Sequence, residues 1–338
     1  MSQELVQTAN ALVAKGKGIL AADESFPTIA KRFKSIDLES TEENRRDYRH
    51  MLFTAPEFAD YVSGVILFDE TLRQNGPDGK RLAEVLSDNG VIPGIKVDKG
   101  AKDLAGFAGE KVTEGLDGLR DRLKAYYELG ARFAKWRAVI DIAPGIPTAY
   151  CLEANAHGLA RYAALCQEAN IVPIVEPEVL MDGDHDLARC QEVTEAALTA
   201  VFAQLNAHKV LLEGMLLKPN MVISGKKNGN RAGVQEVAAA TVATLKRCVP
   251  SAVPGIVFLS GGQSSVEATA HLDAMNKIGD LPWALSFSYG RALQEDALQA
   301  WKGSADNVPS AQKVFNHRAK MNGAAAVGEY SEALEAGA

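Results

Sequence analysis

Short apolar runs recur along the chain, separated by longer stretches in which apolar residues lie three or four positions apart. Each run has the length of a strand. Most runs are apolar at nearly every position, as is typical of parallel strands buried on both faces. Eight such runs occur, at residues 18–22, 64–68, 91–97, 131–140, 171–175, 214–217, 255–259 and 283–287. In the stretches between the runs, apolar residues three or four positions apart predict helices at residues 119–129, 153–169, 187–207, 234–248 and 266–278.

Eight strands that alternate with helices predict an α/β fold of the (β/α)8 TIM-barrel type. The predicted strands begin about 38 residues apart on average, which leaves room for a helix after each strand. A doubly wound open sheet is the alternative, but no Gly-x-Gly-x-x-Gly motif follows the first strand. We expect a single barrel domain at residues 1–320. We expect residues 321–338, which are rich in Ala, Gly and Glu, to form a mobile C-terminal tail.

Composition narrows the possible classes of protein. The 338 residues are 47% hydrophobic and 23% charged, as in an ordinary globular domain with a large core. The net charge of −7 argues against non-specific binding to nucleic acid. No apolar run approaches the roughly 18 residues that predict a membrane span, and the N-terminus lacks the apolar core of a signal peptide. The four cysteines form no Cys-x-x-Cys pair, so we expect a protein of the reducing cytoplasm. From the net charge and the apolar runs, we expect neither nucleic-acid nor membrane partners.

Charged residues gather at the carboxyl ends of the predicted strands. In a barrel these ends meet at one face, where barrel enzymes carry their active sites. A single charge there usually marks only the point where a strand reaches solvent. Lys135 and Arg137, however, lie within an apolar strand, and Glu176 and Glu178 flank a proline directly after another. Residues two apart on a strand share a face, so these cations and carboxylates should pair with each other or with a ligand.

Lys218 is the best candidate for a nucleophile. It follows three apolar residues and precedes a proline at a strand end. A lysine amine attacks a carbonyl only when deprotonated, and burial or neighbouring cations lower the lysine pKa. For Lys218 alone, a strand-end salt bridge explains the position equally well. The neighbouring strand ends add possible cationic neighbours and carboxylates that could move protons, namely Lys135, Arg137, Asp23, Glu176 and Glu178.

A glycine turn at residues 260–263 separates the seventh predicted strand from a helix. Barrel enzymes commonly bind phosphate at the loops after strands seven and eight, where freed backbone N–H groups and a helix N-terminus attract a dianion. Arg291 begins the helix after the eighth strand and is placed to contact the same phosphate. Lys96 and Ser25 lie across the barrel mouth and suit a second phosphate.

The sequence predicts neither a metal site nor a cofactor. The six histidines are scattered, mostly over predicted helices, and none forms a His-x-x-x-His pair. The acidic run at residues 182–186 lacks the twelve-residue pattern of a calcium loop. Its composition favours a cap for the next helix.

Seven segments resemble the class I fructose-bisphosphate aldolases. They are Gly-Ile-Leu-Ala-Ala-Asp-Glu-Ser (18–25), Gly-Ile-Lys-Val-Asp-Lys-Gly (94–100), Phe-Ala-Lys-Trp-Arg (133–137), Ile-Val-Glu-Pro-Glu (174–178), Leu-Leu-Lys-Pro-Asn-Met (216–221), Leu-Ser-Gly-Gly-Gln-Ser (259–264) and Phe-Ser-Tyr-Gly-Arg-Ala-Leu (287–293). The resemblance implies a metal-independent barrel lyase of glycolysis and gluconeogenesis. Such a lyase cleaves fructose 1,6-bisphosphate reversibly, through a lysine Schiff base, to dihydroxyacetone phosphate and glyceraldehyde 3-phosphate.

The resemblance also implies a role for each matching residue. Lys218 matches the imine lysine and Glu176 the main acid/base, while Glu178 matches a residue that holds the neighbouring lysines. Asp23 matches the residue that assists carbon–carbon cleavage, and Lys135, with Arg137 beside it, matches the cation that orients substrate. One implied phosphate site comprises Ser260, Gly261, Gly262 and Arg291, and the other comprises Lys96 and Ser25. The implied partners are sugar phosphates and further copies of the chain, as a homo-oligomer such as a tetramer.

Two departures from the animal enzymes stand out. The animal pattern has Thr-Gly-Ser where this chain has Phe26, Pro27 and Thr28, so we expect the second phosphate site to be altered but retained. The animal enzymes end in a tyrosine used for proton transfer, whereas the last tyrosine here is Tyr330. Two other functions remain open alternatives: a transaldolase-like enzyme for a monophosphate substrate, and a binding or scaffold protein that keeps the barrel.

Overall fold

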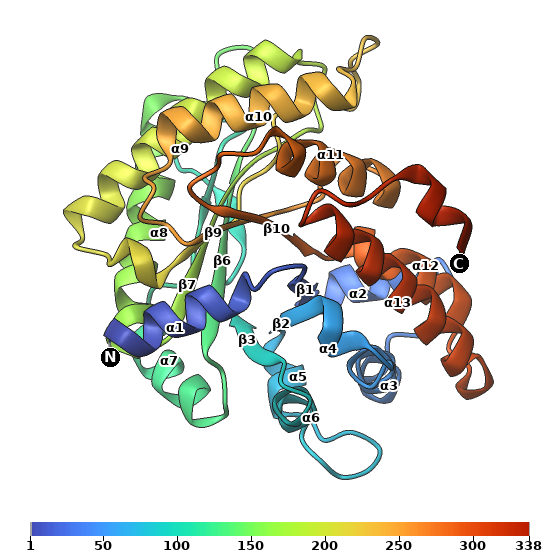
Figure 1. The fold of residues 1–338 in the computed structure, drawn as a ribbon. Coiled ribbons are helices and arrows are strands. Elements are labelled where there is room, and N and C mark those ends of the chain that lie inside the picture. The colour runs from blue at the N-terminus through green and yellow to red at the C-terminus, as the bar shows by residue number, and fades with distance from the viewer. Residues whose placement is uncertain (1, 338) are drawn as a thin grey trace.

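The computed structural model describes residues 2–337. Eight parallel strands close into a barrel in which neighbours follow the order β1–β2–β3–β6–β7–β8–β9–β10, with β10 pairing back to β1 (Figure 1). The strands are β1 (Gly18–Ala22), β2 (Val62–Leu67), β3 (Ile92–Lys96), β6 (Phe133–Ile140), β7 (Val172–Val179), β8 (Leu216–Leu217), β9 (Gly255–Phe258) and β10 (Ala284–Tyr289). The predicted TIM barrel is therefore confirmed, and the open sheet is wrong.

The five predicted helices are present in the structure. They are α7 (Leu119–Glu128), α8 (Ala149–Glu168), α9 (Leu187–Ala207), α10 (Val234–Cys248) and α11 (Ser265–Ile278). At the starts of α8, α9 and α11, a side chain accepts from a backbone N–H group that has no partner within the helix. Asp186 accepts from Arg189 N and so caps α9, as the acidic run predicted. Ser264 and Glu267 form a reciprocal capping box at the start of α11.

Further elements complete the fold, and among them the helix that begins at Arg291 was predicted from the sequence. They are the helices α1 (Ser2–Leu12), α2 (Phe26–Lys34), α3 (Glu42–Phe53), α4 (Phe58–Tyr61), α5 (Asp69–Arg73), α6 (Leu82–Asp88), α12 (Arg291–Trp301) and α13 (Val308–Ala325), the antiparallel hairpin β4 (Ala101–Asp103) and β5 (Lys111–Thr113), and the 3₁₀ turns η1 (Leu212–Gly214), η2 (Ala305–Asn307) and η3 (Glu332–Gly337). No helix within residues 2–337 is both long and apolar enough to cross a membrane.

Helix α1 closes the amino-terminal end of the barrel. Its buried residues Leu5, Ala9 and Leu12 join side chains from the strands in one apolar cluster. Two strand glycines leave room for this contact. A Cβ added to Gly64 would lie 2.6 Å from Leu12 Cδ2, and one added to Gly255 would lie 2.5 Å from Val13 Cγ1. The barrel therefore has an apolar floor, made in part by a helix that precedes the first strand.

The C-terminal segment packs against the barrel domain. The expected boundary at residue 320 lies inside α13, which continues to Ala325. Beyond it, the buried Tyr330 donates its hydroxyl hydrogen to Glu335 Oε1 at 2.9 Å, and Arg318 contacts both oxygens of that carboxylate at 2.8 and 2.9 Å. The expected boundary therefore falls inside a helix, and the extent of the domain stays a prediction. The mobility expected for the final residues stays a prediction.

Candidate active site

A cavity of about 360 Å³ opens at the carboxyl ends of the barrel strands. Its lining includes most of the residues singled out from the sequence, namely Asp23, Ser25, Lys96, Lys135, Arg137, Glu176, Glu178, Lys218, Ser260 and Gly261. Gly262 and Arg291 line an adjoining hollow, which shares Arg137, Glu178 and Gly261 with the first. The barrel thus brings together residues that are up to 268 positions apart in the sequence, as Asp23 and Arg291 are.

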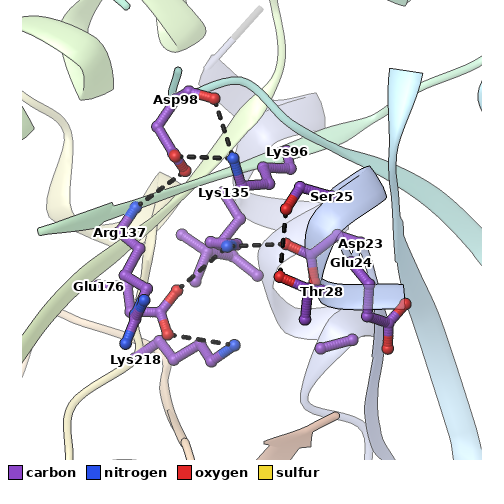
Figure 2. A network of polar contacts seen from close by, with 12 residues as sticks. Asp23, Glu24, Ser25, Thr28, Lys96, Asp98, Lys135, Arg137, Glu176 and Lys218 are labelled. Carbon is purple, nitrogen blue, oxygen red and sulfur yellow. Dashed lines mark hydrogen bonds and ion pairs between the residues drawn. The ribbon is translucent and has the colours of Figure 1, made fainter. Parts of the chain in front are cut away.

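Four charged side chains form an alternating chain across the cavity (Figure 2). Lys218 Nζ lies 3.4 Å from Glu176 Oε1, and Glu176 Oε2 lies 3.6 Å from Lys135 Nζ. Lys135 Nζ lies 2.7 Å from Asp23 Oδ2. Lys218 and Lys135 are each only 4% exposed and Glu176 only 3%. Glu176 therefore bridges two buried lysines and is placed to exchange protons with either.

The strand pairing sets this geometry. Strands β6 and β7 pair in register over eight residues, with Arg137 opposite Glu176. Lys218 directly follows the short strand β8, and its main-chain N–H donates to Val175 O on β7 at 2.8 Å. Strand β6, which carries Lys135, and strand β8, which leads into Lys218, therefore flank β7, which carries Glu176.

The charges of Lys135 and Asp23 stabilise each other. Burial alone would raise the pKa of Asp23, but Lys135, Lys218 and Lys96 outweigh it and lower that pKa to about 2. Burial would likewise lower the pKa of Lys135, but Asp23 and Glu176 outweigh it and raise that pKa above its ordinary value. Lys135 therefore remains an ammonium and is a poor nucleophile, while its positive charge stands beside the Lys218–Glu176 pair.

Asp98 organises one side of the cavity, and sequence reasoning did not single it out. Lys96 Nζ lies 2.8 Å from Asp98 Oδ1 and also donates to Asp98 O at 3.0 Å. The other carboxylate oxygen accepts from Arg137 N at 3.3 Å. The position of Asp98 just after β3 is the signal in the sequence that could have revealed this residue. Asp98 thereby ties the candidate phosphate cation Lys96 to the strand that carries Lys135.

Glu178 holds an arginine. Its Oε2 accepts from Arg137 Nε, and among the described residues no lysine lies within ion-pair distance of its carboxylate. The role implied by the resemblance, holding the neighbouring lysines, stays a prediction for Glu178, and the ion pair that the structure shows for it is with Arg137. Glu178 contributes to raising the pKa of Arg137 above its ordinary value, so this cation stays charged at the mouth.

The start of helix α2 presents two hydroxyl groups to the cavity. Ser25 precedes helix α2, and its Oγ lies 3.1 Å from Thr28 Oγ1 in the first helical turn (Figure 2). Pro27 suits this turn because its missing N–H would have no partner within the helix. Phe26 packs edge-on against Phe68, with ring centres 5.2 Å apart. The substituted Phe-Pro-Thr segment thus still offers two hydroxyls at a helix N-terminus, where anions are favoured.

A buried carboxylate that the sequence reasoning missed supports the loop after β1. Glu24 accepts from Arg32 Nη1 at 2.5 Å and from Gln294 Nε2 at 3.0 Å, and Arg49 Nη2 lies 3.5 Å away. The same Gln294 amide nitrogen donates to Ala21 O at 2.7 Å. These contacts fix the main chain immediately beside Asp23.

The glycine turn after β9 rests on a methionine. A Cβ added to Gly261 would lie 2.5 Å from Met181 Cε, and one added to Gly262 would overlap Met181 Cγ. Gly262 also has a φ of +77°, which disfavours any side chain. Arg291 Nη2 donates to the main-chain oxygen of Gln263 at the end of this turn. The turn, Met181 and Arg291 therefore form one packed unit at the rim, of which the sequence revealed only the glycines and the arginine.

Comparison with known proteins decides the family. The family described as fructose-bisphosphate aldolase class-I matches residues 4–338. The chain belongs to the class I fructose-bisphosphate aldolase family. Its sequence is 60% identical over 329 residues to the probable fructose-bisphosphate aldolase class 1 of Xanthomonas campestris, covering 97% of this chain and 98% of the relative. It is 55% identical to the cytosolic fructose-bisphosphate aldolase 4 of Arabidopsis thaliana, covering 97% of this chain and 84% of that one.

Structural comparison agrees with the sequence match. The chain matches a solved aldolase of Plasmodium falciparum, in complex with TRAP and a small-molecule inhibitor, with a TM-score of 0.97 and 50% identity. The match covers 98% of this chain and 96% of that one. The resemblance read from the motifs is thus confirmed. The aldolase activity is the reversible cleavage of fructose 1,6-bisphosphate through a lysine Schiff base, independent of metal.

Proposed function

We propose that Lys218 is the lysine that forms the Schiff base with the substrate ketone. One observation carries this assignment. Of the two buried lysines that contact Glu176, Lys135 is held as an ammonium by Asp23, which leaves Lys218 to supply the nucleophile.

In this proposal Glu176 moves protons while the imine forms and breaks. The Lys218 amine attacks the ketone carbon, and the resulting alcohol leaves as water after Glu176 protonates it. The protonated imine then accepts the electron pair of the breaking C3–C4 bond, while a base removes the proton of the C4 hydroxyl. Asp23 is the proposed base at C4. The released aldehyde leaves an enamine, which is protonated at C3 and hydrolysed to the ketose phosphate.

The two phosphates of the substrate are proposed to bind at opposite sides of the cavity. The ketone carbon lies next to the C1 phosphate, and strand β9 pairs directly with β8, which leads into Lys218. The turn of Ser260, Gly261 and Gly262 with Arg291 therefore suits the C1 phosphate. Ser25, Thr28 and Lys96 suit the C6 phosphate, because they line the cavity from β1, α2 and β3. A site for each of two phosphates argues against a transaldolase-like enzyme, and the buried charge set argues against a pure scaffold.

Borohydride trapping tests the assignment. Reduction in the presence of dihydroxyacetone phosphate should add the mass of the reduced adduct to the peptide that contains Lys218, and Lys218→Met should abolish it. Lys246, an exposed residue of α10 that lines neither the cavity nor the adjoining hollow, provides the control variant Lys246→Met, and its adduct should form normally. An adduct on Lys135 or Lys96, or no adduct, would refute the proposal.

Two further features follow from the family. We propose that the protein is cytoplasmic, because one relative carries the word cytosolic in its name. We also propose that it forms a homo-oligomer, with a tetramer as the form implied by the resemblance. Light scattering during size-exclusion chromatography tests the second statement directly, and a monomer at micromolar concentration would contradict it.

A further inference from the structure

A buried polar pair lies behind the glycine turn, and the mechanism above gives it no role. The pair consists of Gln263, at the end of the turn, and His271, on helix α11. They are 2% and 5% exposed, and His271 Nδ1 lies 2.6 Å from Gln263 Oε1. An amide oxygen only accepts hydrogen bonds, so Nδ1 of His271 carries the hydrogen in this contact.

Gln263 connects this pair to both parts of the proposed C1 phosphate site. Its main-chain N–H closes the turn on Ser260 O at 3.3 Å. Its main-chain oxygen accepts from Arg291 Nη2. One residue therefore contacts the turn, the candidate phosphate cation and the helix that follows.

The pair is an unusual choice for a purely structural contact. Within the described part of the chain, Gln263 Nε2 is buried without a hydrogen-bond partner, which costs stability. An apolar pair of similar size would avoid that cost. Burial also lowers the pKa of His271 to about 4, so the ring stays neutral near neutral pH and the contact keeps one form.

We propose that Gln263 and His271 are positioning residues for the substrate phosphate that adjoins the ketone carbon. His271 fixes the Gln263 side chain, and this sets the direction of the main-chain oxygen that holds Arg291 and the orientation of the 260–262 N–H groups. The proposal rests on the proposed function only in taking this turn as the C1 phosphate site. Neither residue needs to touch the reacting carbons.

The test compares two ligands that differ only in the phosphate. Apparent affinities for dihydroxyacetone phosphate and for dihydroxyacetone are measured by borohydride trapping on wild type, His271→Leu and His271→Asn. His271→Leu should lower the affinity for dihydroxyacetone phosphate by about 5- to 10-fold, as expected for the loss of one buried hydrogen bond. The affinity for dihydroxyacetone should stay within about 2-fold of wild type. His271→Asn keeps a donor close to the position of Nδ1 and should restore most of the difference. The KM for fructose 1,6-bisphosphate should rise with little change in kcat.

A matched control separates positioning from stability. Asn276 lies on the same helix and donates to Leu272 O, Leu285 O and Ala325 O, away from the turn. Asn276→Ala should lower the melting temperature without changing the ratio of the two affinities. Gln263→Leu serves as a second single variant, and combining it with His271→Leu should give no further loss beyond either alone.

The outcomes are distinct. An equal loss of affinity for both ligands in His271→Leu, no loss for either, or a fully additive double variant would overturn the proposal. Failure of the proposed function is recognised separately, because wild type would then form no adduct at Lys218 with either ligand.

Discussion

The two ends of the barrel are filled in opposite ways. At the amino-terminal floor, Leu5 and Leu12 of helix α1 pack against strand side chains such as Phe133, and glycines admit the bulk. At the carboxyl-terminal mouth, Lys135, Glu176 and Lys218 are buried just as deeply, but they carry charge. The side chains at both ends are buried, but only those at the floor contribute their burial to stability.

The difference has a physical cause. Burying an aliphatic side chain contributes about 1.5–3 kcal/mol, whereas a buried charge is costly unless it is paired. The mouth offsets that cost by alternating Asp23, Lys135, Glu176 and Lys218, so each charge faces one of opposite sign. Such pairs roughly break even for stability, but they fix the protonation states that an active site needs. The floor supplies the rigid base on which this arrangement is held.

The largest effect is expected at the mouth. Glu176→Gln keeps the shape of the side chain and removes its titrating group, so kcat should fall by about 10²- to 10⁴-fold with little change in KM. The melting temperature should fall as well, because Lys218 loses its carboxylate partner. Steady-state cleavage kinetics with fructose 1,6-bisphosphate measure the first effect and thermal unfolding the second. Turnover within a few-fold of the parent would show that another group is the main acid/base.

Substitution at the floor should lower the stability of the protein and leave its activity nearly unchanged. Leu12 is fully buried, so Leu12→Ala should lower the free energy of unfolding by about 2–5 kcal/mol. The kcat/KM of the folded enzyme should stay close to that of wild type. Urea unfolding followed by circular dichroism measures the loss, and Leu334→Ala, at a position 42% exposed, is the matched control. A large fall in kcat/KM without a loss of stability would contradict the prediction that the floor contributes to stability and not to catalysis.

A smaller difference should appear on acidification. Burial lowers the pKa of His271 from 6.5 to about 4, so between these pH values the unfolded chain binds a proton that the folded chain does not. The stability of the folded state at this group is therefore highest above pH 6.5, falls progressively as the pH drops from 6.5 to about 4, and loses no more below that. His271→Asn should therefore lose less stability than wild type between pH 7 and pH 4.5. Parallel melting temperatures across that range would contradict the assignment.

The smallest effect is expected at Tyr330, which lies outside both ends of the barrel. Tyr330→Phe removes the hydrogen bond to Glu335 and should cost about 0.5–1.5 kcal/mol of stability. Proton exchange on dihydroxyacetone phosphate should stay unchanged, because the hydroxyl is held by the C-terminal segment. If exchange fell by more than about 100-fold with binding intact, Tyr330 would be the missing proton donor.

The strands and the charged mouth were predictable because their signals are local. A strand buried on both faces is apolar at nearly every position, and a charge at its carboxyl end interrupts that run, as Lys218 does after Leu217. The helices that went unpredicted are mostly short, such as α5, which spans only Asp69–Arg73. Their stability comes from the surfaces on which they pack, and periodicity alone does not report those surfaces.

The sequence by itself determined the barrel, the residues at its mouth and the family, because each is written in residues adjacent along the chain. Only the tertiary structure decided which groups meet. Met181 lies beneath Gly261, Glu178 pairs with Arg137, and Gln294 reaches Glu24 across 270 positions. Periodicity reports that a side chain is buried, but the partner depends on closure of the barrel. Closure brings distant strand ends within hydrogen-bond distance, and no local pattern encodes that distance.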